Sequence, residues 1–329
     1  MSFLFLNHED VESLLPMAEC IEVVEESLRA LSRGEAVQPL RSAVWMPDRH
    51  GLLGVMPGML GRREDGVAGV KVLTVLPDNF TRGEDSHQGI VLLFDQEHGR
   101  PYALLDAGAV TAIRTAAASA VATRALARPD AGNLAILGTG VQARTHLEAM
   151  RAVRTLRQVR IWSRNFENAR RLAEEEGSRL GLAIEPVSTA WQAVEGADLI
   201  CTVTAAREPV LLGEWIAPGA HINAVGACTP NARELDGAAM ARSSLFTDRK
   251  ESLLAEAGDF LLARADGAID ESHVQGELGD VLQGKILGRR SHDDVTLFKS
   301  LGIAVEDLAT GRHVYAKALA TGQGTKLDL

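Results

Sequence analysis

The segment Asn133–Met150 reads NLAILGTGVQARTHLEAM and has the pattern of a strand, a glycine turn and a helix. The apolar run LAIL leads directly into Gly138, and helical spacing begins after Gly140. Glycines at these positions let backbone amides approach a ligand closely at the positive end of a helix. Ala143 stands where a GxGxxG fingerprint has its third glycine, and alanine still permits close packing of helix on strand. The pattern predicts a dinucleotide-binding turn; a strand-to-helix turn without a nucleotide is the alternative.

Apolar strands alternate with helical segments along the chain that follows this turn. Strand-like stretches include VRIW (159–162), DLICTVT (198–204) and HINAVG (221–226). An alanine-rich stretch over 109–130 predicts the helix that leads into this region. Alternation of this kind is typical of a parallel sheet between two layers of helices. We therefore predict an α/β fold, with a Rossmann-type, doubly wound parallel sheet over residues 119–304.

The chain before this domain has a different pattern. Residues 13–36 carry a proline near their start and apolar residues at helical spacing, which predicts one long amphipathic helix. β-rich stretches follow over 40–106, and the last two read as a hairpin around QEHGR. Residues 295–319 predict a long final helix that returns to this region. Both chain ends, residues 1–118 and 305–329, are thus expected to form a second, α+β domain.

The composition limits the classes of function. The formal net charge of −10 argues against a nucleic-acid partner, because phosphate binding draws on clustered Lys and Arg. The three cysteines lie far apart without CxxC spacing, so neither a disulfide framework nor a metal site is predicted. No apolar run reaches the roughly 18 residues of a membrane span, and the start MSFLFLNHEDVESLL has no basic region or cleavage signature. We expect a cytoplasmic protein without a membrane partner.

The preferred coenzyme is expected to depend on the end of the second strand of the doubly wound sheet. In NAD-preferring sites an acidic residue there binds the ribose hydroxyls. This chain has Ser163, Arg164 and Asn165 instead, which offer hydrogen-bond donors and a positive charge. We therefore predict that NADPH is preferred and that NADH is possible. A solvated arginine on a loop is the other interpretation.

Five stretches, taken together, resemble the ornithine cyclodeaminase/mu-crystallin family. They are SHQG (86–89), AIRTAAASA (112–120), GTGVQA (138–143), PGAHINAVGA (218–227) and FKSLGIAVED (298–307). The resemblance covers nearly the whole chain and is nearer to mu-crystallin-type ketimine reductases than to cyclodeaminases. It implies a Rossmann domain plus a substrate domain that dimerises and is built from both chain ends. A homodimer is also expected because the β-stretches of the first domain would expose edges and apolar faces.

The resemblance implies three catalytic cations. Arg41 corresponds to the family's arginine that meets the substrate carboxylate, where it would act as a bidentate clamp. Lys71 corresponds to the active-site lysine, and its apolar neighbours in GVKVLTVL would lower the pKa of the amine. Arg114 corresponds to the second arginine, near the substrate carboxylate and the coenzyme pyrophosphate. Without the resemblance, Lys71 reads as a snorkelling edge-strand lysine and Arg114 as a solvated helix residue.

Further residues are expected around the substrate and the coenzyme. The substrate pocket is expected to include Met56, His87 and Cys228, although a structural histidine is an equally good interpretation of His87. The residues expected to bind the coenzyme are Thr115, Gly138, Thr139, Gly140, Val141, Gln142, Ser163, Arg164, Asn165 and Thr204.

Cys228 marks a departure from the cyclodeaminases, which place an aspartate at this point. A carboxylate there would activate water or bind a substrate ammonium, whereas a thiol keeps its proton at neutral pH. Cyclodeamination is therefore disfavoured. Cys228 is interpreted as a small apolar wall residue rather than as a nucleophile.

Together these features predict an NAD(P)H-dependent reductase of small cyclic α-imino acids. Hydride transfer to such an imine needs a nicotinamide, a carboxylate anchor and a group that keeps the imine protonated. Arg41, Arg114 and Lys71 meet the last two needs. The expected substrates are Δ1-pyrroline-2-carboxylate and Δ1-piperideine-2-carboxylate, which would give L-proline and L-pipecolate. Ornithine cyclodeamination, alanine-dehydrogenase-like reductive amination of a 2-oxo acid, and a nucleotide-binding crystallin-like protein without turnover are the alternatives.

Overall fold

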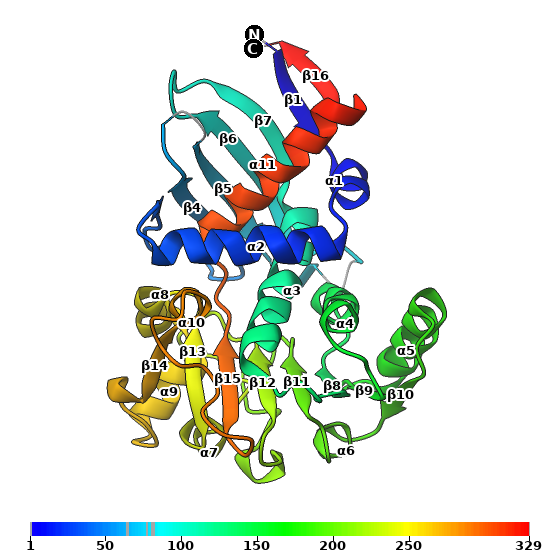
Figure 1. Cartoon of the computed structure of the whole chain (residues 1–329). Coiled ribbons are helices and arrows are strands. Elements are labelled where there is room, and N and C mark those ends of the chain that lie inside the picture. The colour runs from blue at the N-terminus through cyan, green and yellow to red at the C-terminus, as the bar shows by residue number, and fades with distance from the viewer. Residues whose placement is uncertain (1, 64–65, 77, 80–82, 329) are drawn as a thin grey trace. The chain divides into compact units, whose positions relative to one another are not determined.

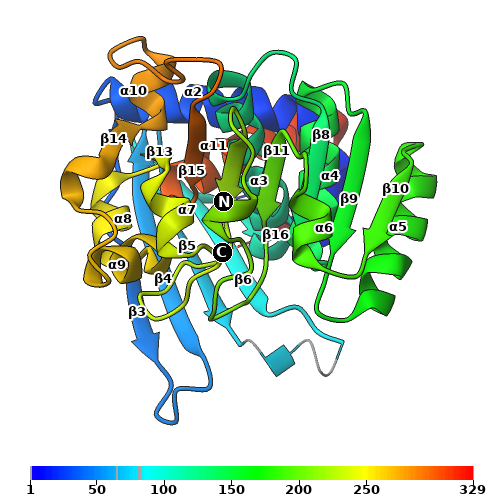
Figure 2. The same ribbon diagram turned by 90° about the horizontal axis from the view of Figure 1, so that it is seen from below.

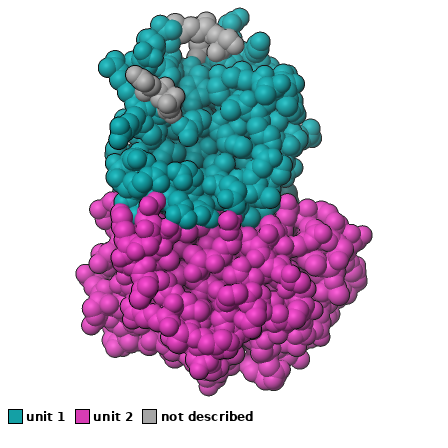
Figure 3. All heavy atoms as spheres, in the orientation of Figure 1, with its two compact units in different colours: residues 1–115, 302–329 teal, residues 116–301 magenta. Residues whose placement is uncertain are grey.

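The computed structural model describes residues 2–63, 66–76, 78–79 and 83–328. Internal contacts divide the chain into unit 1, residues 1–115 and 302–329, and unit 2, residues 116–301 (Figure 3). Both boundaries lie three residues before those predicted from the sequence. The first one falls within the alanine-rich helix α3 (Ala107–Leu126).

Unit 2 contains a parallel sheet of eight strands. In chain order these are β8 (Asn133–Leu137), β9 (Gln158–Trp162), β10 (Ile184–Val187), β11 (Leu199–Thr202), β12 (His221–Ala224), β13 (Ser243–Thr247), β14 (Val274–Glu277) and β15 (Val295–Lys299). Their order in the sheet is β10-β9-β8-β11-β12-β15-β13-β14, and every neighbouring pair is parallel. Figure 2 shows β10 at one edge and β14 at the other. The predicted doubly wound sheet is confirmed, and its strand order reverses between β8 and β11.

Helices connect these strands, and their ends follow local sequence rules. They are α4 (Val141–Val153), α5 (Phe166–Leu180), α6 (Ala190–Val194), α7 (Gly237–Ala241), α8 (Lys250–Glu256), α9 (Gly258–Ala265) and α10 (Leu278–Leu282), with short 3₁₀ turns at Gly213–Trp215 and Glu271–His273. Asn165 caps the start of α5, and Gly181 ends that helix with φ of 64°. Thr189 and Gln192 form a capping box at α6.

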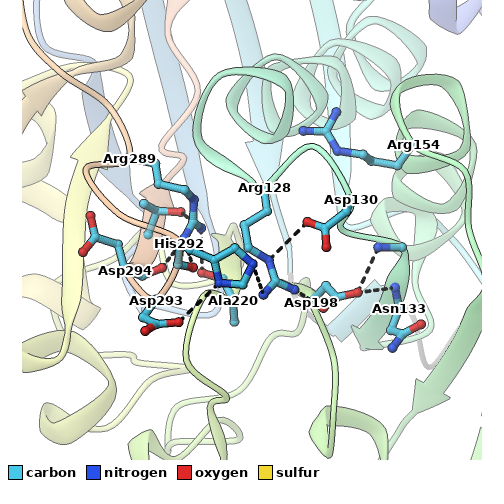
Figure 4. Close-up of polar contacts among 12 residues, drawn as sticks. Arg128, Asp130, Asn133, Arg154, Asp198, Ala220, Arg289, His292, Asp293 and Asp294 are labelled. Atoms are coloured by element: carbon cyan, nitrogen blue, oxygen red, sulfur yellow. Dashed lines mark hydrogen bonds and ion pairs between the residues drawn. The ribbon is translucent and has the colours of Figure 1, made fainter.

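A polar network fixes the amino ends of the unit 2 strands (Figure 4). The Asp198 carboxylate accepts hydrogen bonds from the backbone N–H groups of Gly132 and Asn133, both at 3.0 Å, and from Arg128 at 2.6 Å. Arg289 donates to the carbonyl of Ala220, just before β12, at 3.1 Å. Asp198 and Arg289 thus satisfy backbone atoms at or just before the first residues of the strands. Ligands of doubly wound sheets bind at the opposite, carboxyl ends.

Unit 1 contains a second, mixed sheet of eight strands. They are β1 (Ser2–Leu6), β2 (Ala36–Val37), β3 (Ser42–Trp45), β4 (Leu52–Leu60), β5 (Val67–Val75), β6 (His87–Asp95), β7 (Pro101–Asp106) and β16 (Thr325–Asp328). The order is β16-β1-β7-β6-β5-β4-β2, with β3 also paired to β4. The predicted hairpin of β6 and β7 is confirmed. β1 and β16 pair antiparallel, so the two chain ends lie side by side (Figure 1).

Helices cover one face of this sheet. They are α1 (His8–Leu14), α2 (Met17–Ser32) and α11 (Ala304–Thr321). α11 packs against β4, β5, β6 and α2 (Figure 1). Side chains of β4 alternate accordingly: Met56 and Leu60 are buried, whereas Pro57 and Met59 are exposed. One face of the sheet is therefore core, and the other presents apolar side chains.

Two predicted helices differ from the observed ones. Residues 13–36 contain the end of α1, all of α2 and the start of β2, because Pro16 separates the two helices. The first five residues of 295–319 form β15, and the helix begins only at Ala304. All five are buried between β12 and β13, so sheet pairing decides their structure. The strands β1, β2, β14 and β16 were not predicted.

Candidate active site

Lys71 is buried at the centre of the unit 1 sheet. It lies in the middle of β5, directly opposite Met56 on β4 and Val91 on β6. All three side chains therefore share the face that α11 covers. The side chain of Lys71 is almost fully buried, and Met56 is buried beside it. An ammonium group in such surroundings needs a partner.

Asp307 on α11 provides that partner. Its Oδ2 lies 2.7 Å from the Nζ of Lys71, and its Oδ1 accepts a hydrogen bond of 2.8 Å from the Nε of Arg114 on α3. The neighbouring Glu306 accepts from the Nη1 of Arg114 at 3.2 Å. Thr111, one turn before Arg114, accepts from the Nζ of Lys71 at 3.3 Å. Three elements of unit 1 thus converge on one buried cluster of ions.

The surroundings change the pKa of both members of the central pair. Burial and the charge of Arg114 lower the pKa of Lys71 to about 8, although Asp307 opposes them. Burial acts to raise the pKa of Asp307, but Arg114 and Lys71 outweigh it and hold that pKa below its usual value. Lys71 can therefore exchange a proton near neutral pH, while Asp307 stays ionised.

Arg41 reaches the same cluster from the loop before β3. Its Nη2 lies 3.4 Å from the carbonyl oxygen of Gly302, and the side chain is partly buried. Gly302 has φ of +72°, and a β-carbon there would lie 2.5 Å from the Nη1 of Arg114. Glycine at this position lets the guanidinium of Arg114 lie against the backbone. The structure thus brings Arg41, Lys71 and Arg114 together in unit 1.

His87 lies on the same face of the sheet, at the start of β6. It lines a pocket of about 640 Å³ together with His8, Asp85, Gln88, Asp106 and Gly108. The imidazole ring of His87 faces this pocket, so much of its surface is exposed. Protein still surrounds the ring on several other sides. These surroundings and the charge of Lys71 lower the pKa of His87 to about 4. The imidazole is therefore neutral at pH 7.

The glycine turn of unit 2 lies at the reversal point of its sheet. Gly138 follows β8 with φ of +128°, and a β-carbon there would lie 2.7 Å from the carbonyl oxygen of Val203, after β11. Gly140 is the N-cap of α4, and within the described chain no side chain caps this helix. A β-carbon on Gly140 would meet open space. Uncapped amides at a helix N-terminus beside open space fit a pyrophosphate.

Thr139 and Ser163 link this turn to the end of β9 through a hydrogen bond of 3.3 Å. Arg164 is exposed and forms no ion pair with the other described residues. Asn165 uses its side-chain oxygen to cap α5, which gives this residue a structural role. Val141 and Gln142 form the first turn of α4. Thr115 is buried directly after Arg114 in α3, as the last residue of the first segment of unit 1.

Glu234 is a buried residue of unit 2 that the sequence reading missed. Its carboxylate accepts four hydrogen bonds: from Thr202 Oγ1 at 2.8 Å, from Thr204 N and Oγ1 at 2.6 and 2.7 Å, and from Gly226 N at 2.7 Å. These donors lie at the carboxyl ends of β11 and β12. Glu234 therefore shapes the loops after both strands, and the hydroxyl of Thr204 is turned toward it.

Cys228 lies near the end of β12, and its thiol donates to the carbonyls of Val225 at 3.2 Å and Ser300 at 3.7 Å. Nearby, Lys299 at the end of β15 pairs with Asp259 at 2.9 Å, and both side chains are fully buried. The charge of Asp259 helps to keep the pKa of Lys299 above its ordinary value, against the effect of burial. Cys228 also packs against the hydrophobic core of unit 2.

A usable signal existed for Asp307 but not for Glu234. Helical spacing in α11 places Asp307 beside the buried residues Ala304, Leu308 and Gly311, so an acid at a core position was visible in the sequence. Glu234 lies outside any helix or strand, and its partners come from two distant strands. No periodic pattern marks it.

Comparison with known proteins places these features in context. The model of the ornithine cyclodeaminase/mu-crystallin family matches residues 1–322. Ketimine reductase mu-crystallin of Mus musculus is 41% identical over 316 residues, which cover 94% of this chain and 96% of that protein.

Two solved structures are similar over the full length. The Thermococcus litoralis Δ1-pyrroline-2-carboxylate reductase, in complex with NADH and L-proline, is 41% identical with a TM-score of 0.96, covering 99% of this chain and 100% of that one. An archaeal alanine dehydrogenase dimer with bound NAD is 32% identical with a TM-score of 0.93, and each chain is covered completely.

The described residues include neither a helix suited to span a membrane nor a cluster suited to hold a metal ion. No helix among them is both long and apolar enough to span a membrane. No group of three or more His, Cys, Asp or Glu side chains in the described ranges could hold a metal ion. With a family match that extends over nearly every residue, this chain belongs to the ornithine cyclodeaminase/mu-crystallin family.

Proposed function

We propose that this protein is an NAD(P)H-dependent imine reductase that converts small cyclic α-imino acids into L-amino acids. The substrates would be ketimines such as Δ1-pyrroline-2-carboxylate and Δ1-piperideine-2-carboxylate, and the products L-proline and L-pipecolate. The observation that carries this proposal is Lys71, which is buried, has a pKa of about 8 and lies in one cluster with Arg41 and Arg114. The relatives named as ketimine and pyrroline-carboxylate reductases support it.

The charges of the cluster suit a substrate with one carboxylate. Arg41, Lys71 and Arg114 bring three cations to this cluster, where Asp307 pairs with Lys71 and Arg114, and Glu306 pairs with Arg114. His87 adds none, because its lowered pKa keeps it neutral. Guanidinium groups beside such a site suit a substrate carboxylate, because they can bind it through charge-assisted hydrogen bonds. Arg41 and Arg114 are the proposed carboxylate anchors.

Lys71 would supply the proton of the reaction. An imine carbon accepts hydride readily only when its nitrogen is protonated, and an ammonium with a pKa near 8 is a suitable donor at neutral pH. Burial excludes water from this ammonium and strengthens its effect on the imine. A bound nicotinamide coenzyme would supply the hydride.

The coenzyme would be held by unit 2. The pyrophosphate would lie against Thr139, Gly140, Val141 and Gln142, and Gly138 would allow its close approach. The ribose would lie against Ser163, Arg164 and Asn165. Thr204 after β11 and Thr115 of α3 are also proposed to bind the coenzyme. We propose a preference for NADPH, since Arg164 is exposed and its charge would attract a 2′-phosphate. NADH, which the Thermococcus litoralis enzyme binds, would be a second coenzyme.

The uncovered face of the unit 1 sheet is proposed as a homodimer interface. Val37, Val44 and Met59 are all at least half exposed there. An apolar groove of about 240 Å³ runs beside them, lined by Pro39, Val70 and others. Exposed apolar patches of this kind mark interaction sites. The dimer of the archaeal alanine dehydrogenase supports this proposal.

Two rival reactions would use the same fold. Alanine-dehydrogenase-like reductive amination is favoured by the second solved relative, whereas ornithine cyclodeamination is disfavoured by Cys228, which supplies no carboxylate after β12. A panel of cyclic imines, 2-oxo acids with ammonia, and L-ornithine separates the three reactions by their substrates. Imine reduction and reductive amination consume reduced coenzyme, whereas ornithine cyclodeamination does not.

A further inference from the structure

We infer that Asp307 positions Lys71 and keeps its ammonium protonated near neutral pH, so that a single N–H of Lys71 is aimed at the substrate. The effect on the proton of Lys71 follows from the geometry of unit 1 alone. The effect on turnover rests on the proposed function.

The geometry of Asp307 is that of a two-sided clamp. One carboxylate oxygen lies 2.7 Å from the Nζ of Lys71, and the other accepts from the Nε of Arg114 at 2.8 Å. The Asp307 side chain is completely buried, so water does not weaken either contact. Because α11, β5 and α3 each contribute one of the three residues, the carboxylate fixes the lysine relative to two other elements of unit 1.

The partners of Lys71 leave one direction for a ligand. An ammonium has three N–H donors. Asp307 forms an ion pair with the ammonium at 2.7 Å, and Thr111 accepts a hydrogen bond from it at 3.3 Å. The third N–H is the one that we assign to the imine nitrogen. A lysine ammonium that is held by two contacts delivers its proton from a fixed position. Hydride transfer to the imine carbon, next to the protonated nitrogen, requires such a fixed geometry.

The cations around Lys71 disfavour its protonated form. Arg114 on α3 and Arg41 before β3 are both cations, and each lowers the pKa of Lys71. His87 on β6 is neutral, and Glu306 is bound to Arg114. Asp307 is therefore the group that offsets burial and two positive charges. Without it, Lys71 would lose its proton at a lower pH.

Glu306 offers a matched control for Asp307. The two residues are adjacent on α11. Both carboxylates are completely buried, and both form ion pairs with Arg114. Asp307 lies 2.7 Å from the Nζ of Lys71, whereas Glu306 forms an ion pair with Arg114. Asp307→Asn and Glu306→Gln each remove one negative charge from the same cluster. Only the first should change the protonation of Lys71 strongly.

The direct test is the titration of Lys71 by ¹³C NMR in protein labelled at the lysine ε-carbons. The chain has six lysines, and Lys71→Met identifies the signal of Lys71. In the wild type we expect a midpoint near pH 8. Asp307→Asn should lower this midpoint by about 1–3 pH units, the range for loss of an adjacent opposite charge. Glu306→Gln should lower it by less than half as much.

A second readout connects the titration with turnover. The rate of imine reduction should fall above the midpoint of Lys71, so Asp307→Asn should move the alkaline limb of kcat/KM to lower pH by the same interval. Asp307→Glu keeps the charge but displaces it by one methylene. It should keep the NMR midpoint within about half a pH unit, while kcat falls at least tenfold because the ammonium is misplaced.

The outcomes separate the inference from the proposed function. An unchanged Lys71 midpoint in Asp307→Asn, or equal shifts in both charge-removing variants, would overturn the inference. The expected midpoints in a protein that reduces no imine would uphold Asp307 as the partner of Lys71 and contradict the proposed reaction. If Asp307→Asn does not fold, Asp307→Glu decides: wild-type kcat in that variant would refute positioning.

Discussion

Gly302 lies so close to Arg114 that a β-carbon on the glycine would be 2.5 Å from the guanidinium. The same glycine offers its carbonyl oxygen to Arg41 at 3.4 Å. One backbone position thus supports both proposed carboxylate anchors. Its φ of +72° adds a conformational reason for glycine.

Gly302→Ala should therefore raise KM for a cyclic imino acid at least tenfold, because the methyl group displaces Arg114. Gly322→Ala is the matched control: Gly322 has φ of +71°, but a β-carbon there meets nothing within 4 Å. Both variants should lose about 1 kcal/mol of stability from the strained φ. Thermal unfolding and initial-rate kinetics compare them. Equal KM values in the two variants would rule out the contact as the cause.

Lys71→Met should lower kcat by about 10²–10⁴, the usual contribution of a general acid. Coenzyme affinity should stay unchanged, because unit 2 is proposed to hold the coenzyme. In the wild type, the reaction should be fast below pH 8 and slow above it, since Lys71 acts in its protonated form and its pKa is about 8. Rates across the pH range check both points. Near-wild-type kcat in Lys71→Met at every pH would mean that another group supplies the proton.

Arg164→Ala should weaken NADPH binding by about 1.5–3 kcal/mol, the value of a charge-assisted hydrogen bond. NADH binding should hardly change, because NADH has no 2′-phosphate. Arg170→Ala serves as control, since Arg170 on α5 is exposed but paired with Glu167 and Glu174. Fluorescence titration measures the four affinities. A similar loss for both coenzymes in Arg164→Ala would argue against recognition of the phosphate.

Met59→Glu should convert a dimer into a monomer, because it places a charge on the uncovered apolar face of unit 1, where Met59 is 50% exposed. Leu287→Glu makes the same chemical change at a 75% exposed residue of unit 2 and should leave the dimer intact. Light scattering at micromolar concentration gives the masses. A wild-type protein that is already monomeric would contradict the proposed interface.

The parts of the fold that the sequence predicted depend on local patterns. The turn at Gly138 and Gly140 joins an apolar strand to an amphipathic helix, so one short stretch contains the whole pattern. Lys71 could be singled out because a charge inside an apolar strand is unusual, and the family resemblance implied that it is the active-site lysine.

The parts that could not be predicted depend on partners far along the chain. β15 was assigned to a helix, because its pairing with the distant strands β12 and β13 leaves no local pattern. Its charged end, Lys299, likewise pairs with the distant Asp259. Arg114 was expected to meet a substrate carboxylate, but its protein partners Asp307 and Glu306 lie at the other end of the sequence. Periodicity gives the face on which a residue lies, and only the folded chain shows which charge it meets there.

The most direct test of the central claim measures coenzyme consumption with defined substrates. The purified protein would be supplied with NADPH or NADH and, separately, with Δ1-pyrroline-2-carboxylate, Δ1-piperideine-2-carboxylate, pyruvate plus ammonia, or L-ornithine. The account predicts rapid consumption with the two cyclic imines, formation of L-proline and L-pipecolate, and loss of both in Lys71→Met. Faster consumption with pyruvate and ammonia, or release of ammonia from L-ornithine without net coenzyme consumption, would contradict it.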